Sequence, residues 1–213
     1  MTTLLKMTHP SLRQLKKSRP ELNGKMLGRG SFTVVYPRDQ HSVWKLSIDP
    51  YNYGLATSDL NRQSEHFIGA VDNRGIVGYL EELPIYLYAV ERLYPVKDCK
   101  ITNHLVKDFS RRYEVGSLLD CPRHPRDDHA GIAQGMAQNM STPGSLRHAM
   151  TLLHRYIMDN DCSLDLGNRA NFMRHPDGRL ILSDPIYHET MLDEYMEILN
   201  PPGDELFDDE NWI

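Results

Sequence analysis

The spacing of apolar residues changes near residue 92, and this change constrains the fold more than any other feature of the sequence. Between residues 26 and 90, apolar residues alternate with polar ones in short runs separated by Gly and Pro, as in half-buried strands. From residue 103 onward, apolar residues recur at the helical spacing of three and four. Strands followed by helices predict an α+β protein with two parts that meet near residues 91–95.

The first part is predicted to hold a five-stranded antiparallel sheet with one helix, and the second part to be mainly helical. Residues 121–129 are expected to form a polar loop. Cys121, His124 and His129 lie in that loop without a fourth nearby ligand, which favours a loop over a zinc site. In chain order, the expected elements are a helix at 11–18, strands within 26–47, a helix at 58–68, strands at 76–80 and 85–90, helices at 103–114 and 145–158, a hairpin at 171–182 and a helix at 189–199.

The two ends of the chain carry opposite charge, although the net charge is only −5. The first 25 residues contain six Lys or Arg and one acid, whereas residues 189–213 contain nine Asp or Glu and no Lys or Arg. We expect both ends to be solvated, with a basic arm over residues 1–21 and an acidic tail over residues 201–213. Three cysteines without paired spacing indicate a reducing compartment such as the cytoplasm, and no apolar run is long enough to span a membrane.

A glycine-rich turn lies between the first two expected strands. Gly28 and Gly30 allow the backbone to approach phosphate oxygens, to which its N–H groups then donate. Lys45 follows in the middle of the next strand, either as an outward-facing side chain or as a ligand of the phosphates. We expect Glu65, on the helix predicted at 58–68, to be its ion-pair partner; a solvated face is the alternative for Glu65.

A second group of polar residues lies more than 100 residues further along the chain. Asp165 and Asp184 flank the hairpin that begins with Asn171. Phosphoryl transfer requires a carboxylate that orients or deprotonates the attacking hydroxyl and oxygen ligands that hold Mg²⁺ on the nucleotide. Asp165 fits the first role, and Asn171 with Asp184 fits the second.

Three stretches make the chain resemble the protein kinases, most closely the early serine/threonine kinase domain of podovirus-type coliphages. They are residues 25–32 (Lys-Met-Leu-Gly-Arg-Gly-Ser-Phe), 80–93 and 165–185. The resemblance implies a minimal bilobal fold, with an N-lobe over residues 22–91 and a truncated C-lobe over residues 92–200. It also implies ATP and Mg²⁺ as cofactors and Ser/Thr hydroxyls of bacterial host proteins as acceptors.

The resemblance and the residue patterns together assign the site. Residues 90–93 are expected to be the hinge whose backbone reads adenine. The assigned ATP-binding residues are Gly28, Gly30, Ser31, Val35, Lys45, Val90, Glu91 and Leu93; the assigned catalytic residues are Asp165, Lys45 and Glu65; and the assigned metal ligands are Asn171 and Asp184. The implied partners are the host transcription and RNA-processing machinery, including RNA polymerase, in the host cytoplasm, with no membrane and no direct nucleic-acid contact.

The chain departs from the kinase pattern in its catalytic loop. Ser163-Leu164-Asp165 replaces the usual His-Arg-Asp, so we expect no control by activation-loop phosphorylation. Asn171 lies six residues after Asp165 rather than five, which leaves Asn168 as an alternative ligand. Two other functions stay open: a pseudokinase or inhibitor that binds a host protein through charged surfaces, and a small-molecule kinase.

Overall fold

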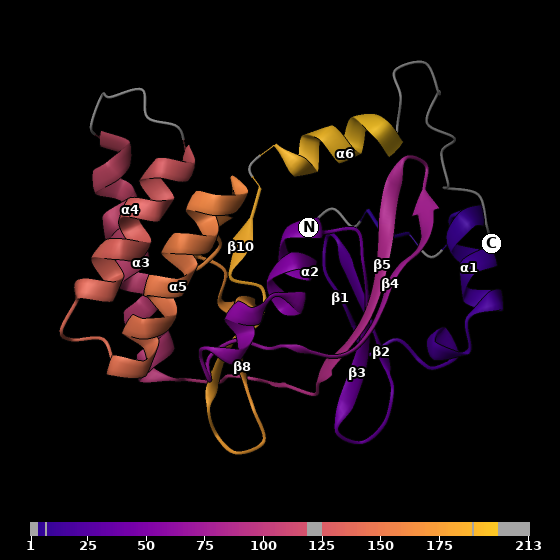
Figure 1. Cartoon of the computed structure of the whole chain (residues 1–213), viewed down its shortest axis with the longest axis horizontal. Coiled ribbons are helices and arrows are strands. Elements are labelled where there is room, and N and C mark those ends of the chain that lie inside the picture. The colour runs from indigo at the N-terminus through magenta and orange to yellow at the C-terminus, as the bar shows by residue number, and fades with distance from the viewer. Residues whose placement is uncertain (1–3, 7, 119–124, 189, 200–213) are drawn as a thin grey trace.

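The computed structural model describes residues 4–6, 8–118, 125–188 and 190–199. Its sheet lies on one side of the molecule, and three long helices lie on the other (Figure 1). Short 3-10 turns lie at Pro20–Leu22, Asp59–Arg62 and Arg169–Asn171. The helices and strands are α1 (Pro10–Ser18), β1 (Gly28–Arg29), β2 (Thr33–Pro37), β3 (Ser42–Ser47), α2 (Pro50–Thr57), β4 (Ala70–Leu80), β5 (Leu83–Glu91), β6 (Tyr94–Pro95), α3 (Lys100–Leu118), α4 (Pro125–Gln138), α5 (Gly144–Asn160), β7 (Ser163–Leu164), β8 (Phe172–Arg174), β9 (Leu180–Leu182), β10 (Ile186–Tyr187) and α6 (Met191–Leu199).

The antiparallel five-stranded sheet is confirmed, with the strand order β1-β2-β3-β5-β4. Every residue of the central strand β3 is buried, because the sheet is covered on both faces. Trp44 and Leu46 pack with one apolar cluster, and Val43 packs with another, as the alternation of side chains along a strand requires. Lys45 is on the same face as Val43.

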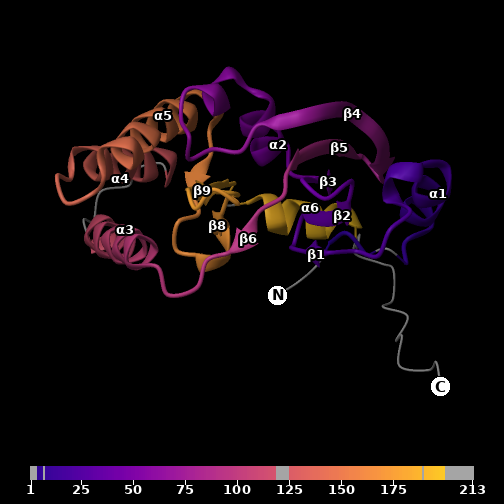
Figure 2. The ribbon, with the colours of Figure 1, turned by 90° about the horizontal axis from the view of Figure 1, so that it is seen from below.

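Both ends of the described chain pack against this sheet. Leu4, Leu12 and Leu15 are buried in the same apolar cluster as Trp44 and Leu46. Residues of α6 join that cluster from the other end of the sequence, and Figures 1 and 2 show α6 beside the sheet and α1 at its edge. The segment predicted as a basic arm is therefore partly core, because α1 turns an apolar face inward and its basic residues outward.

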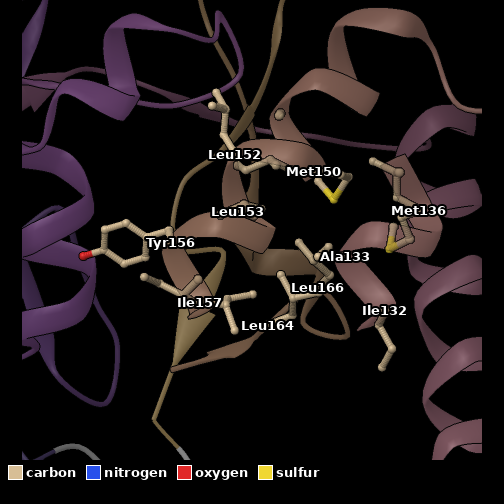
Figure 3. Packing of buried hydrophobic residues seen from close by; sticks show 14 of the residues in the cluster. Ile132, Ala133, Met136, Met150, Leu152, Leu153, Tyr156, Ile157, Leu164 and Leu166 are labelled. Atoms are coloured by element: carbon tan, nitrogen blue, oxygen red, sulfur yellow. The ribbon is translucent and has the colours of Figure 1, made fainter. Parts of the chain in front are cut away.

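Helices α3, α4 and α5 form the second core. Buried residues of α4 and α5 pack together around Leu164 and Leu166, as Figure 3 shows. The polar loop predicted at 121–129 is wrong for residues 125–129, which begin α4; Cys121 and His124 lie outside the described residues. Ala130, Ala133 and Met136 supply the buried face of α4 at spacings of three.

The helix predicted at 58–68 is also wrong. The helix forms earlier, as α2, because the side chain of Asp49 accepts hydrogen bonds from the backbone N–H groups of Tyr51 and Asn52 and Pro50 occupies the first helical position. Ser58 does act as an N-cap, but only for the 3-10 turn Asp59–Arg62. The other predicted helices and hairpins correspond to α1, α3, α5, α6 and the pairs β4–β5 and β8–β9.

Helix α2 joins the sheet to the helical part. Tyr156 of α5 points toward α2 (Figure 3), and its hydroxyl donates to the carbonyl oxygen of Tyr51 at 3.0 Å. Gly54 makes this approach possible, because a Cβ added there would lie 2.7 Å from the Tyr156 hydroxyl oxygen. No helix among the described residues is both long and apolar enough to cross a membrane.

Candidate active site

The glycine-rich turn connects β1 to β2. Gly28 pairs with Val35, and the turn closes where the N–H of Gly30 donates to the carbonyl oxygen of Thr33 at 2.8 Å. A Cβ added to Gly28 would meet no atom within 4 Å, and one added to Gly30 would come no closer than 4.0 Å to another residue. Neither glycine has a positive φ. Packing and backbone conformation within the chain therefore do not require glycine at either position.

The tip of this turn is held by both ends of the described chain. The N–H of Leu4 donates to the carbonyl oxygen of Ser31 at 2.9 Å. The carbonyl oxygen of Phe32 accepts from the N–H of Ile48 at 3.0 Å, and the Phe32 ring packs edge-on against Tyr195 of α6, with 6.0 Å between ring centroids. These contacts fix the position of the turn above the end of β3.

Lys45 lies in the middle of β3, between Val35 on β2 and Tyr88 on β5. Its side chain is only 10% exposed, and its Nζ donates to Asp184 Oδ1 at 2.6 Å. Burial, the largest effect, lowers the pKa of Lys45, but the negative charge of Asp184 and its other polar neighbours outweigh it and the pKa is raised above its usual value. Lys45 is therefore charged and paired at neutral pH.

The prediction that Glu65 pairs with Lys45 is wrong. Glu65 lies in a turn after α2 with its side chain 51% exposed, and its carboxylate lies 3.8 Å from His66 Nε2. The physical reason is the early start of α2: the helix has ended before residue 65, so no helical turn directs that side chain toward the sheet. Asp184, which is 139 residues away in sequence, takes the position next to Lys45.

Two short strand pairs bring Asp165 and Asp184 together. Strand β7, just before Asp165, pairs with β10, just after Pro185, and the N–H of Asp165 donates to the carbonyl oxygen of Pro185 at 2.8 Å. Strands β8 and β9 pair on the other side, and the N–H of Ser183 donates to the carbonyl oxygen of Asn171 at 2.8 Å. The main chain thus places Asp165, Asn171 and Asp184 around one point.

Asn171 contacts Asp165 directly. Its Nδ2 donates to Asp165 Oδ2 at 2.7 Å and to the carbonyl oxygen of Asp165 at 2.9 Å. Asn168 is exposed instead, and its Oδ1 caps the following 3-10 turn by accepting from the N–H of Ala170 at 3.0 Å. Of the two asparagines that the sequence left open, Asn171 is the one whose side chain contacts the carboxylate. Asn168 contributes its backbone N–H to Asp165, and its Nδ2 donates to Asn171 Oδ1 at 3.4 Å.

The environment of Asp165 favours a proton on its carboxyl group. Burial is the main cause that raises the pKa of Asp165, and the negative charge of Asp184 raises it further. The hydrogen bond from Asn171 opposes these effects by stabilising the charged form. A carboxylate with a raised pKa is a better proton acceptor than an ordinary aspartate.

Three of the residues assigned to ATP binding lie in one apolar cluster. Val35, Val90 and Leu93 gather with Val43 and Ile181 on the face of the sheet that carries Lys45. Glu91 points away from the cluster, and its Oε2 lies 3.1 Å from His175 Nε2. The Glu91 side chain therefore takes no part in the cluster, and only its backbone belongs to the predicted hinge.

Asn171 and Asp184 are the residues that the sequence assigns as magnesium ligands. Among the described residues, no three His, Cys, Asp or Glu side chains gather into a metal cluster. Mg²⁺ does not require such a cluster, because it usually takes one or two protein ligands and completes its shell with water and substrate phosphates. The side-chain oxygens of Asn171 and Asp184 are of the type that it prefers.

The sequence analysis missed three buried polar residues beside Lys45. Asp49 and Asn52 are 5% and 9% exposed, and Tyr88 is 1% exposed. Asn52 Nδ2 donates to Asp49 Oδ2 at 2.7 Å and to the carbonyl oxygen of Ile186 at 2.9 Å, which links α2 to the segment that follows Asp184. The Asp49-Pro50 pair directly after a strand was the available signal, because it is a typical start of a helix.

Comparisons with known proteins found no relative of this chain. No protein-family model, no curated protein and no solved structure matches the chain.

Proposed function

We propose that this chain is an ATP-dependent serine/threonine protein kinase of minimal, phage-like bilobal form. The observation that carries the proposal is the 2.6 Å ion pair between Lys45 and Asp184. It links β3, which pairs with the second strand of the glycine-rich hairpin, to Asp184, which lies beside Asp165 and Asn171. Phosphoryl transfer requires these parts together: a turn and a lysine for the phosphates, oxygen ligands for the metal, and a carboxylate for the acceptor.

In this proposal, the phosphates of ATP lie under the turn that contains Gly28 and Gly30 and against Lys45. Asn171 and Asp184 would hold Mg²⁺, which would supply positive charge to offset the negative charge that develops during transfer. The hydroxyl oxygen of a Ser or Thr substrate attacks the γ-phosphorus, and the bond from that phosphorus to the β–γ bridging oxygen breaks. Asp165 accepts the hydroxyl proton, and ADP leaves.

The proposal is tested by incubating the protein with bacterial lysate, γ-labelled ATP and Mg²⁺, beside the variants Asp165→Ala and Lys45→Met. Label is expected in lysate proteins, on Ser or Thr, with the wild type alone. Equal labelling by all three proteins would refute the assignment of these residues. Label confined to small molecules would favour a small-molecule kinase, and no label at all would favour a pseudokinase that acts by binding.

The two glycines provide a test that separates ligand binding from folding. Gly28→Ala and Gly30→Ala are expected to leave the melting temperature unchanged or slightly raised, since a Cβ fits at both positions and alanine restricts the unfolded chain. The KM for ATP is expected to rise by about tenfold, because the added Cβ would hold the phosphates away from the backbone of the turn at a cost comparable to one hydrogen bond. A lower melting temperature with an unchanged KM would show that the turn serves the fold alone.

A further inference from the structure

A small cavity lies behind Lys45. Its volume is about 10 Å³, and four of its eight lining side chains are apolar. The polar ones are Lys45 of β3, Asn52 of α2, Tyr88 of β5 and Ser183 beside Asp184. The cavity therefore lies where the sheet, α2 and the metal-binding segment meet.

Two buried polar atoms at this cavity lack a partner. Asn52 Oδ1 and the Tyr88 hydroxyl oxygen make no hydrogen bond to any described residue. Burial raises the pKa of Tyr88, whereas the positive charge and hydrogen-bonding contact of the nearby Lys45 ammonium both lower it. The two groups are nevertheless too far apart or too poorly aligned for a hydrogen bond of normal geometry. Buried polar groups without partners are rare in folded proteins because their desolvation is uncompensated.

One water molecule would satisfy these atoms. The volume is just sufficient for a single water. A water there would donate one hydrogen bond to Asn52 Oδ1 and accept from the Tyr88 hydroxyl and the Lys45 ammonium. Three partners are typical of a buried water.

We propose that this cavity is a binding site for one buried water, which joins Asn52, Tyr88 and Lys45 into a single polar network. Through Asn52 the network continues to Asp49 Oδ2 at 2.7 Å and to the carbonyl oxygen of Ile186 at 2.9 Å.

The network has a role that rests on the proposed kinase function. Asp184 is the ion-pair partner of Lys45 in this structure, and in the proposed kinase it would leave Lys45 to hold Mg²⁺. The water then keeps a hydrogen bond on Lys45, while the buried negative charge of Asp49 continues to favour the charged lysine. Asn52 and Tyr88 are thus positioning residues, because they act on the phosphates only through Lys45.

The sign of a stability change tests the water site. Tyr88→Phe is expected to lower the melting temperature by about 2–4 °C, because it removes a hydrogen-bonded hydroxyl. Tyr86→Phe is the matched control, since Tyr86 lies on the same strand and stacks on Tyr53 outside the cavity; a change below about 1 °C is expected there. An unchanged or raised melting temperature for Tyr88→Phe would overturn the proposal, since removal of an unsatisfied hydroxyl costs nothing.

A high-resolution crystal structure of the wild type gives the second test. Electron density for one water within hydrogen-bonding distance of Asn52 Oδ1 and the Tyr88 hydroxyl is expected, and an empty cavity would overturn the site.

The role of the network in positioning Lys45 is tested by kinetics: Tyr88→Phe is expected to raise the KM for ATP with little change in kcat. An unchanged KM would overturn the link to Lys45. A chain that transfers no phosphate would refute the kinase proposal while the density and the melting temperatures still decide the water site.

Discussion

Replacing Asp165 with asparagine is expected to abolish most phosphoryl transfer and, at the same time, to make the fold more stable. Loss of a positioned proton acceptor lowers kcat by about 10²–10⁴-fold. The amide keeps the shape of the side chain and an oxygen that accepts from Asn171 Nδ2, but it removes a partly buried negative charge beside Asp184. A gain in stability on loss of activity is typical of a residue retained for chemistry.

The stability gain of Asp165→Asn should depend on pH in a defined direction. Because the pKa of Asp165 is raised in the folded state, the folded protein holds a proton that the unfolded chain has released. The free energy of unfolding of the wild type, measured relative to that of the variant, is therefore greatest below the ordinary pKa of an aspartate. It falls as pH rises through the raised pKa that Asp165 has in the folded state. Melting temperatures of both proteins from pH 3.5 to 8 check this. A difference that is constant with pH, or of opposite sign, would contradict the burial argument.

Removing the carboxylate of Asp184 is expected to destabilise the protein by about 2–3 kcal/mol, because it leaves the buried ammonium of Lys45 without its ion-pair partner. The expected cost is below that of a fully buried pair, since the Asp184 side chain is 40% exposed. Lys45→Met is expected to cost much less, because an apolar side chain of similar length leaves only the more exposed carboxylate unpaired.

A double-mutant cycle measures the coupling free energy between Lys45 and Asp184 directly. Adding Lys45→Met to Asp184→Ala should recover most of the lost free energy of unfolding, measured by urea denaturation. Asp59→Ala is the control, since its ion pair with Arg62 is almost fully exposed and should be worth less than about 1 kcal/mol. Additive effects of the two site substitutions would show that the pair contributes nothing to the fold.

The sheet was predictable from the sequence because each strand has a local pattern of alternating apolar and polar residues. Residues 26–47 and 76–90 alternate apolar and polar side chains, and Gly and Pro mark where the strands end. Helix α4 was missed because it buries small side chains and contains two glycines. One of them, Gly135, has a tertiary reason: a Cβ there would lie 2.6 Å from Arg112 Nη1 of α3, which the sequence does not reveal.

The sequence predicted which residues form the candidate site, but not which of them pairs with Lys45. Lys45, Asp165, Asn171 and Asp184 stood out by residue type and spacing, and the structure brings them together. The partner of Lys45 depends on how β10 and β7 pair, which is a long-range contact that local spacing does not encode. The contact of α6 with the glycine-rich turn is also a long-range one. The sequence showed that this helix has an apolar face, but not which surface the face covers.

A crystal structure of the protein with Mg²⁺ and a non-hydrolysable ATP analogue tests the central claim most directly. We expect the phosphates between the turn of Gly28 and Gly30 and the ammonium of Lys45, and the metal between the side-chain oxygens of Asn171 and Asp184. The γ-phosphate should face Asp165. A nucleotide bound elsewhere, or phosphates that contact neither Lys45 nor the metal ligands, would contradict the account.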